Sequence, residues 1–244
     1  MKKSTILIFS ALVFFLCSLT AFNFAMKAEY DKGLFRDPLV DFISTDITGF
    51  DAIQVNGGSK LSVKIVQGAS QVRVHERAQD FVRFKKQGNK LIVDVDQIKG
   101  RDFRYNGSYS VYISCPKLTS LTTSARYKMG GEPQTDLFLQ EIYHNITLNN
   151  FTQDSLTIQQ DHATAVELNN LKLGKLKAVV GLSEGSGSRL TILGKNQIQA
   201  ADLSIQHKGG LNLFDVAIPS LTYQFSDSAR AVFSGAALPA LSKK

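Results

Sequence analysis

The string Leu148-Asn149-Asn150 returns 20 residues later as Leu168-Asn169-Asn170, and this recurrence decides the fold. Large apolar residues extend it into a column with spacings of 20, 24, 21 and 20 residues: Leu148, Leu168, Ile192, Leu213 and Phe233. A second column has spacings of 18, 17, 20, 27 and 18 residues: Leu121, Leu139, Leu156, Leu176, Leu203 and Leu221. These spacings predict a repeat of about 20 residues.

A repeat of about 20 residues cannot bury its own apolar face, so it must stack on its neighbours. We therefore expect a parallel β-solenoid, with column residues inward and alternate residues in solvent, such as Thr157, Lys177, Ser204 and Thr222. The paired asparagines should form a ladder at a corner, because asparagine accepts a positive φ and can hydrogen-bond between coils. A β-sandwich is the alternative, since alternation fits both folds, but the recurrent spacing favours the solenoid.

The region before the repeat shows apolar and polar residues alternating with a period of two. Four segments read as strands with one buried face: residues 53–55, 61–65, 72–74 and 91–95. Glycines mark the turns between them, at Gly57-Gly58, Gly68 and Gly88-Asn89. Helical periodicity is nearly absent after residue 50, so residues 49–244 are expected to form one all-β domain.

The N-terminal segment is almost entirely apolar over residues 5–26, after Lys2 and Lys3. As a helix it is long enough to cross a hydrocarbon core of roughly 30 Å. A signal peptide would be shorter and would carry a small residue three positions before cleavage, where Asn23-Phe24-Ala25 has asparagine. We predict an uncleaved transmembrane anchor at 1–26 and a spacer at 27–48, with a cleaved signal and a secreted domain as the alternative.

The lysines at the start of the chain predict its orientation in the membrane. Lys2 and Lys3 should remain cytoplasmic, because the basic residues that follow the apolar segment are accompanied by Glu29 and Asp31. The β domain then lies outside the cytoplasm.

The charge balance argues against a nucleic-acid partner. From Glu29 onward the chain has 25 basic and 21 acidic residues, and the basic ones are scattered without interleaved stacking aromatics. An anionic glycan or lipid surface is a more plausible partner than nucleic acid. Only two cysteines occur, Cys17 in the apolar segment and Cys115 in an expected strand, so we predict no disulfide and a buried Cys115.

Six segments of the β region carry a recognisable pattern: FDAIQVNG at 50–57, VKIVQG at 63–68, VRV at 72–74, GNKLIV at 88–93, VYISCPKLTSL at 111–121 and SDSARAVFSG at 226–235. Together they resemble the head GIN domain family of bacterial autotransporter adhesins. The likeness covers about residues 50–238 and departs from the family at Ser124-Ala125, where a serine-glycine turn is usual. The apolar segment followed by Lys27-Ala28-Glu29-Tyr30 also resembles membrane-anchored members from the Bacteroidetes group. The resemblance implies a right-handed β-helix and an envelope location. With the anchor, we expect a periplasmic domain on the bacterial inner membrane. The resemblance implies no established activity and no catalytic residues.

One serine pattern matches that of a hydrolase nucleophile. Gly181-Leu182-Ser183-Glu184-Gly185 has the G-x-S-x-G spacing, and Asp202 and His207 follow in the matching order. The pattern requires a helix after the serine, but a Gly/Ser-rich stretch and a strand-like segment follow, so we favour a chance match. Residues 181–188 instead suggest a protruding loop, either a contact surface or a tip without a role.

Other chemical sites are weakly supported. The four histidines, His75, His144, His162 and His207, lack the close spacing of metal ligands. A polysaccharide-active enzyme would need gathered carboxylates, and only Asp161-His162 with Glu167 could converge. We therefore assign no catalytic, cofactor or metal site.

The expected function is a non-enzymatic envelope module that binds or scaffolds an unidentified protein or glycan, as repeat surfaces commonly do. The alternatives are a polysaccharide-active β-helix enzyme that uses Asp161 or Glu167, and an envelope-stress or signalling accessory.

Overall fold

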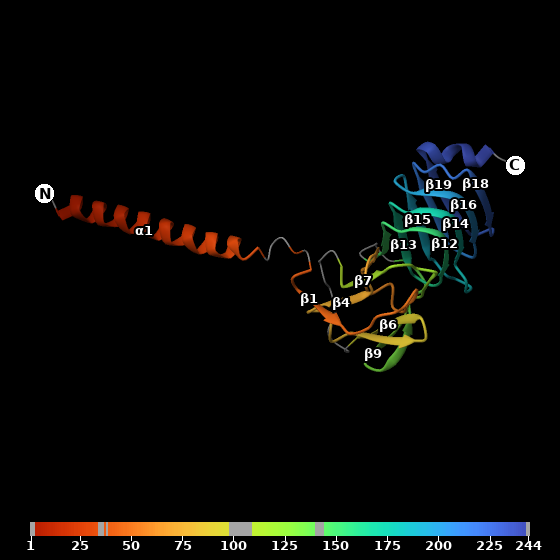
Figure 1. Cartoon of the computed structure of the whole chain (residues 1–244), viewed down its shortest axis with the longest axis horizontal. Helices are drawn as coiled ribbons and strands as arrows, with labels where there is room; N and C mark the ends of the chain where they lie inside the picture. The colour runs from red at the N-terminus through yellow and green to blue at the C-terminus, as the bar shows by residue number, and fades with distance from the viewer. Residues whose placement is uncertain (1–2, 34–36, 38, 98–108, 140–143, 243–244) are drawn as a thin grey trace. The chain divides into compact units, whose positions relative to one another are not determined.

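The computed structural model describes residues 3–33, 37, 39–97, 109–139 and 144–242 of the 244-residue chain. The chain divides into two units, residues 1–42 and residues 43–244 (Figure 1).

The first unit contains one long helix, α1 (Lys3–Asp31). Its most apolar stretch has a mean hydropathy of 2.4, and none of that stretch is buried. At 1.5 Å per residue its 29 residues span roughly 43 Å, more than the roughly 30 Å of a bilayer core. Gly33, with φ of +67°, follows the end of the helix. An N-terminal helix of this kind fits either a membrane anchor or a signal sequence.

The second unit is mostly β, which confirms the expected class, and its strands form two mixed sheets. The first sheet contains, in spatial order, β1 (Phe42–Thr45), β4 (Gln71–His75), β7 (Val111–Cys115), β3 (Val63–Gln67), β11 (Ile146–Asn149), β13 (Ala165–Asn169), β15 (Arg189–Leu193), β17 (Gly210–Phe214) and β19 (Arg230–Ser234). The second contains β10 (Glu132–Thr135), β9 (Arg126–Met129), β6 (Lys90–Gln97), β2 (Ala52–Val55), β8 (Ser120–Thr123), β12 (Thr152–Gln160), β14 (Lys172–Val180), β16 (Gln197–Ile205) and β18 (Ser220–Phe225), with β5 (Val82–Gln87) paired to β6.

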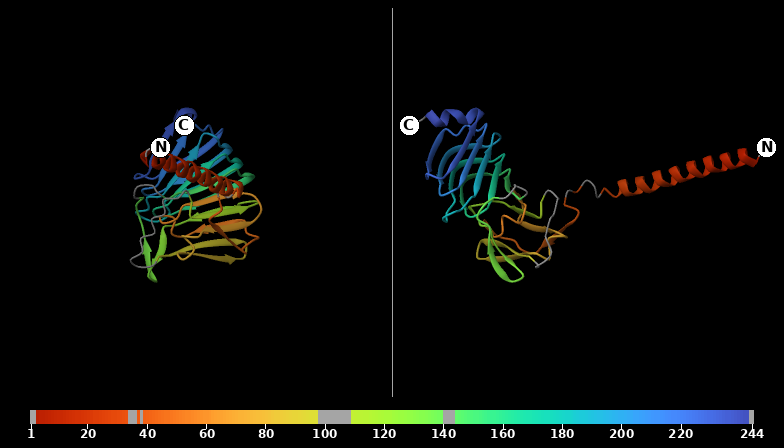
Figure 2. Two further views of the ribbon diagram at one scale, coloured as in Figure 1. Left: turned by 90° about the vertical axis from the view of Figure 1, so that its left-hand side faces the viewer. Right: turned by 180° about the vertical axis from the view of Figure 1, so that it is seen from behind.

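From β11 onward the chain alternates between the two sheets. Odd-numbered strands join the first sheet and even-numbered strands the second, and each strand pairs in parallel with the next one in its own sheet. Figure 2 shows these strands as two facing stacks, green to blue along the chain. Equivalent residues on successive turns of the chain therefore lie side by side.

The strand register confirms the first of the two apolar columns. Leu148 is aligned with Leu168, then come Ile192, Leu213 and Phe233 on the following strands. The first four of these side chains are fully buried, and Phe233 is half-buried in the last strand. This column is therefore the centre of the core under the first sheet.

The second predicted column aligns Leu156 with Leu176 correctly, but the alignment of its members before and after these two leucines is wrong. Leu176 is aligned with Ala201, whereas Leu203 lies two residues further along and is aligned with Ala178. Both residues of β16 face inward, so the alternation of apolar and polar residues could not separate these registers. Leu139 lies outside the strands. Strand β8 pairs directly with β12, and Leu121 is aligned with Ile158.

The asparagine ladder is confirmed. Asn150 and Asn170 have φ of 63° and 57°, and the Asn170 Nδ2 donates to the Asn150 Oδ1 at 2.7 Å. Asparagine tolerates this left-handed conformation better than other residues with a Cβ. The ladder therefore fixes one corner between β11–β12 and β13–β14.

Replacing Asn170 by alanine should lower the free energy of unfolding by about 1–2 kcal/mol, because it removes the hydrogen bond and leaves a Cβ in a strained backbone. Asn170→Gly removes only the hydrogen bond and should cost about 0.5 kcal/mol. Urea unfolding of both variants separates the two contributions. Equal losses of unfolding free energy in the two variants would mean that the positive φ at residue 170 does not strain an alanine there.

The start of the second unit is more irregular than the sequence indicates. The four expected strands occur as β2, β3, β4 and β6, and Gly57 and Gly88 have positive φ at their turns. Among the pairings whose register is described, three are antiparallel: β4 with β7, β5 with β6 and β9 with β10. Strand β5, the β9–β10 hairpin and the closing 3-10 helix η2 (Gly235–Ser242) were not predicted from the sequence. Helix η2 packs on β17 and β19.

Candidate functional site

The loop between β14 and β15 brings Ser183 to Asp161. The Ser183 hydroxyl donates to the Asp161 Oδ2 at 2.6 Å, and the Ser183 backbone N–H donates to the Oδ1 at 2.9 Å. The backbone N–H of His162 also donates to the Oδ1 at 2.9 Å. The carboxylate thus holds the loop to the turn before β13.

His162 lies beside this pair but is not placed to activate the serine. Its Nδ1 is 3.3 Å from the Asp161 Oδ2 without hydrogen-bond geometry, and its side chain is only 5% exposed. Burial lowers the pKa of the His162 imidazole. The Asp161 carboxylate acts in the opposite direction and Arg126 lowers the pKa further, so the net shift is downward. Among the described hydrogen bonds, the Ser183 hydroxyl bonds to a carboxylate and not to an imidazole.

The hydrolase pattern is therefore not assembled. No helix follows Ser183 in the described residues, since the chain runs through a turn into β15. Asp202 lies on β16 and His207 lies in the turn before β17, and neither has a described bond to Ser183. Glu167 lies on β13 in register with Thr147 and Thr191, facing away from the core, and no described bond joins it to Asp161.

Asp161 should make the stability of the second unit sensitive to acid. Burial alone would raise the pKa of this carboxyl, but the hydrogen bonds from Ser183 and His162 outweigh it and lower the pKa. The stabilisation is therefore complete above the unfolded pKa of about 3.9 and is lost as the pH falls through the lower folded value. The difference in unfolding free energy between the native chain and Asp161→Asn should shrink over that range. A difference that stays constant from pH 7 to pH 2.5 would contradict this assignment.

The loop at 181–188 does not protrude along its whole length. Ser186 and Ser188 are fully buried, and the Gly187 N–H donates to the Leu137 carbonyl at 2.9 Å. A Cβ on Gly187 would lie only 3.1 Å from that carbonyl oxygen, so a glycine allows the close approach. The prediction of a protruding loop is thus wrong for its second half.

Cys115 behaves as a buried small hydrophobic residue. It is fully buried, and burial, with a smaller contribution from Asp51, raises the pKa of its thiol to about 12. The thiolate that a nucleophile needs is therefore scarce. This confirms the expected burial of Cys115.

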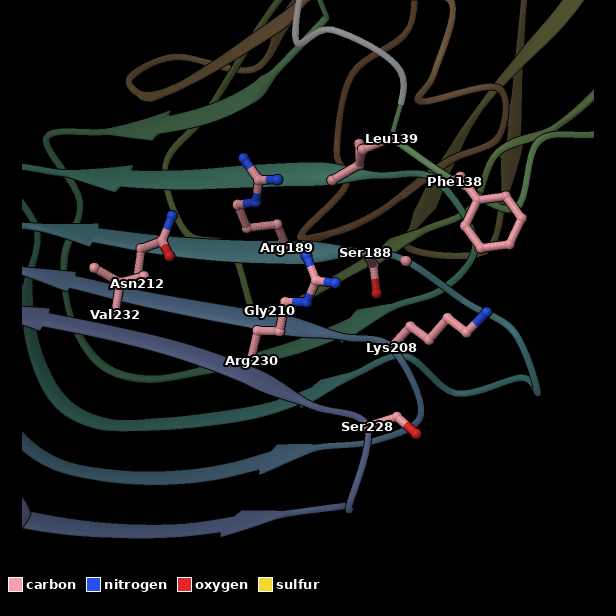
Figure 3. A pocket seen from close by; sticks show the side chains of 11 residues that line it. Phe138, Leu139, Ser188, Arg189, Lys208, Gly210, Asn212, Ser228, Arg230 and Val232 are labelled. Atoms are coloured by element: carbon pink, nitrogen blue, oxygen red, sulfur yellow. The ribbon is translucent and has the colours of Figure 1, made fainter.

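A hollow of about 630 Å³ lies at the starts of β15, β17 and β19 (Figure 3). It is lined by cationic, small polar and a few apolar residues: Phe138, Leu139, Gly187, Ser188, Arg189, Lys208, Gly210, Asn212, Ser228, Arg230 and Val232. No aspartate or glutamate is among them. The hollow is thus a basic site, and it is the candidate functional site.

Backbone hydrogen bonds hold the three strand starts in line. The N–H of Arg189 donates to the Thr164 carbonyl, that of Gly210 to the Ser188 carbonyl and that of Arg230 to the Gly209 carbonyl, at 2.8, 2.8 and 2.9 Å. Arg189, Gly210 and Arg230 are therefore consecutive rungs of one column. At about 4.8 Å per strand, the two arginine Cα atoms are roughly 10 Å apart.

Gly210 leaves room for both arginine side chains. A Cβ there would lie 3.5 Å from the Arg189 Cγ, so the Arg189 side chain already packs over this rung. In Figure 3 the Arg230 side chain extends across Gly210 toward Arg189 and Ser188. The two guanidinium groups thus share one side of the hollow.

Lys208 and Phe138 form the opposite rim. The Lys208 Nζ lies 4.9 Å from the centroid of the Phe138 ring, and 56% of Phe138 is exposed. Within the described residues, no ion pair joins Arg189, Lys208 or Arg230 to a carboxylate. The hollow therefore carries three positive charges that no carboxylate of the described residues pairs with.

This site was not predicted from the sequence, although the sequence contains a signal for it. Arg189, Gly210 and Arg230 are 21 and 20 residues apart, which is the length of the repeat, so they share a position in successive coils. The two predicted columns contain only large apolar residues, so this column of arginine and glycine was not among them. Lys208 and Phe138 come from turns, where the repeat gives no spacing.

No family model and no curated protein matches the chain. Among solved structures, the chain is similar to a "putative adhesin" from Bacteroides fragilis, with 15% identity and a TM-score of 0.48, covering 80% of this chain and 92% of that one. A "putative adhesin" from Parabacteroides distasonis has 11% identity and a TM-score of 0.36, covering 80% and 94%. A "putative lipid binding protein" from the same species has 13% identity and a TM-score of 0.33, with the same coverage.

Proposed function

We propose that the chain is a non-enzymatic binding module of the bacterial cell envelope, and that its ligand binds in the basic hollow. The observation that carries this proposal is a group of three cations in one hollow, Arg189, Lys208 and Arg230, none of which forms an ion pair within the part of the chain that the structure describes. The serine, aspartate and histidine that could suggest catalysis instead bond to one another in a structural loop anchor.

The proposal includes a specific fold for the second unit. Residues 49–244 form a right-handed parallel β-solenoid of the head GIN type, with coils of about 20 residues. The alternation of strands between two sheets and the alignment of Leu148, Leu168 and Ile192 support it. In such a fold, side chains at equivalent positions of successive coils form a continuous surface, which suits binding.

The proposal also includes an inner-membrane location. Residues 1–26 act as an uncleaved anchor, residues 27–48 as a spacer, and the β domain lies in the periplasm. The length and apolar character of α1 support an anchor. An intact-mass measurement on protein isolated from a native host should give a chain that retains residues 1–26. A mature protein without them would instead support a secreted domain.

Binding without turnover is the direct test of this function. The full chain, purified in a neutral detergent, should retain soluble components from a fractionated bacterial envelope and return them chemically unchanged, as judged by mass spectrometry. Ser183→Ala, outside the hollow, should retain the same components. Failure to retain any fraction would refute the binding function. Products that disappear with Asp161→Asn would establish the enzyme alternative.

A further inference from the structure

We propose that the hollow binds the carboxylate or phosphate groups of an acidic glycan, with Arg189 and Arg230 as the principal contacts and Lys208 at the rim. This inference rests on the proposed binding function and names the chemical class of the ligand. It is drawn from the charge, the spacing and the shape of the hollow.

The charge of the hollow favours an anion. Arg189, Arg230 and Lys208 are brought together on three neighbouring turns of the chain, and the lining offers no carboxylate to neutralise them. Like charges held together repel one another, and a bound anion relieves that repulsion. A concave surface lined by one sign of charge also concentrates counterions of the opposite sign.

The type of cation favours a carboxylate or a phosphate. A guanidinium group presents planar N–H donors in a fork that matches two oxygens of such an anion. The Arg189 and Arg230 side chains lie on the same side of the hollow, because no side chain at Gly210 separates them (Figure 3). Two guanidinium groups so placed can contact one group together or two groups on successive units of a polymer.

The rest of the lining favours a hydrophilic chain. Ser228 and Asn212 add a hydroxyl and an amide group around the arginines. Asn212 Nδ2 has one long hydrogen bond, 3.4 Å to the Thr191 Oγ1, and the amide keeps further capacity for a ligand. The exposed Phe138 ring offers a flat apolar surface beside the cations, on which the C–H face of a sugar ring can pack.

The packing beneath the hollow argues against a lipid acyl chain. On the core side of β15 and β17, the side chains of Leu190, Leu211 and Leu213 are fully buried. Cores of this kind are close-packed, so an acyl chain would have to displace them. A lipid could then reach the site only through its headgroup, whereas a glycan can lie along the surface.

The test uses the full chain in a neutral, sugar-free detergent and oligogalacturonate as the acidic probe. Neutral galactan oligomers of equal length are the uncharged probe, and inorganic phosphate and vesicles of phosphatidylcholine with phosphatidylglycerol are the other arms. Oligogalacturonate should bind at least about tenfold more tightly than the neutral oligomers, and phosphate should compete with it. Affinity should fall as salt is raised from 50 to 300 mM, because exposed charges are screened.

Variants assign the binding to the hollow. Arg189→Gln with Arg230→Gln should weaken oligogalacturonate binding by at least about tenfold, since hydrogen bonds to charged groups are among the stronger contacts that a ligand can lose. Lys175→Gln with Lys177→Gln removes the same charge from an exposed part of β14 and should change affinity less than about twofold. Arg189→Lys with Arg230→Lys keeps the charge, tests the fork geometry and should give an intermediate loss.

Four outcomes would overturn the inference. They are equal binding of acidic and neutral oligomers, equal losses in the arginine and lysine double variants, binding to the anionic vesicles alone, and failure of every probe. Neutral-glycan binding that survives both double variants would still support a non-enzymatic binding module, but it would contradict the placement of the ligand at the arginines of the hollow. Failure of every probe would overturn this ligand class, while the envelope-fraction experiment tests the binding function by itself.

Discussion

Leu168→Ala is expected to lower the free energy of unfolding of the second unit by about 2–5 kcal/mol. Leu168 is fully buried and lies in register with Leu148 on one side and Ile192 on the other. Removing three carbons there leaves a cavity within a stack whose strands are held on both sides, so the neighbours can move in only slightly. Chemical unfolding followed by tyrosine fluorescence measures the change.

Leu238→Ala is the matched control, because Leu238 is 51% exposed in η2. Its effect should stay within about 0.5 kcal/mol. Similar losses for both leucines would mean that the column through Leu168 is not the centre of the core.

Gly181→Ala is expected to cost about 3 kcal/mol or more in unfolding free energy. Gly181 has φ of +84°, which strains a residue with a Cβ by about 1–2 kcal/mol. A Cβ there would also collide with the Gln206 carbonyl oxygen, a backbone atom between β16 and β17 that no side-chain rotation can move. The neighbouring coil would have to shift, which adds to the conformational strain.

Gly88→Ala separates these two contributions. Gly88 has φ of +60°, but nothing lies within 4 Å of an added Cβ. This variant should therefore cost only about 1–2 kcal/mol. If Gly88→Ala proves as destabilising as Gly181→Ala, the close approach at Gly181 is not as described.

The sequence predicted best those parts of the fold that depend on repetition. Leu148, Leu168 and Ile192 could be aligned correctly because each is large, inward-facing and one repeat from the next. Leu203 was misassigned by two residues because Ala201 also faces inward, and a shift of two leaves the buried face unchanged. The hairpins before β11 have no repeat, so their pairing depends on long-range contacts that local patterns do not encode.

The candidate site was less predictable than the fold. Ser183 and Asp161 were singled out separately, but only the structure brings them together, and their bonds are structural. Arg189 and Arg230 were hidden among scattered basic residues, because their proximity depends on the stacking of β15, β17 and β19. Assigning a charge cluster therefore required the strand register as well as the composition.

A single titration tests the binding account most directly. Oligogalacturonate is titrated into the full chain, the arginine double-glutamine variant and the Lys175→Gln/Lys177→Gln control, and the recovered oligomer is analysed by mass spectrometry. We expect saturable binding of an unchanged oligomer, weakened at least about tenfold only when Arg189 and Arg230 are both replaced. Binding that is indifferent to the two arginines, or an oligomer returned as cleaved products, would contradict the account.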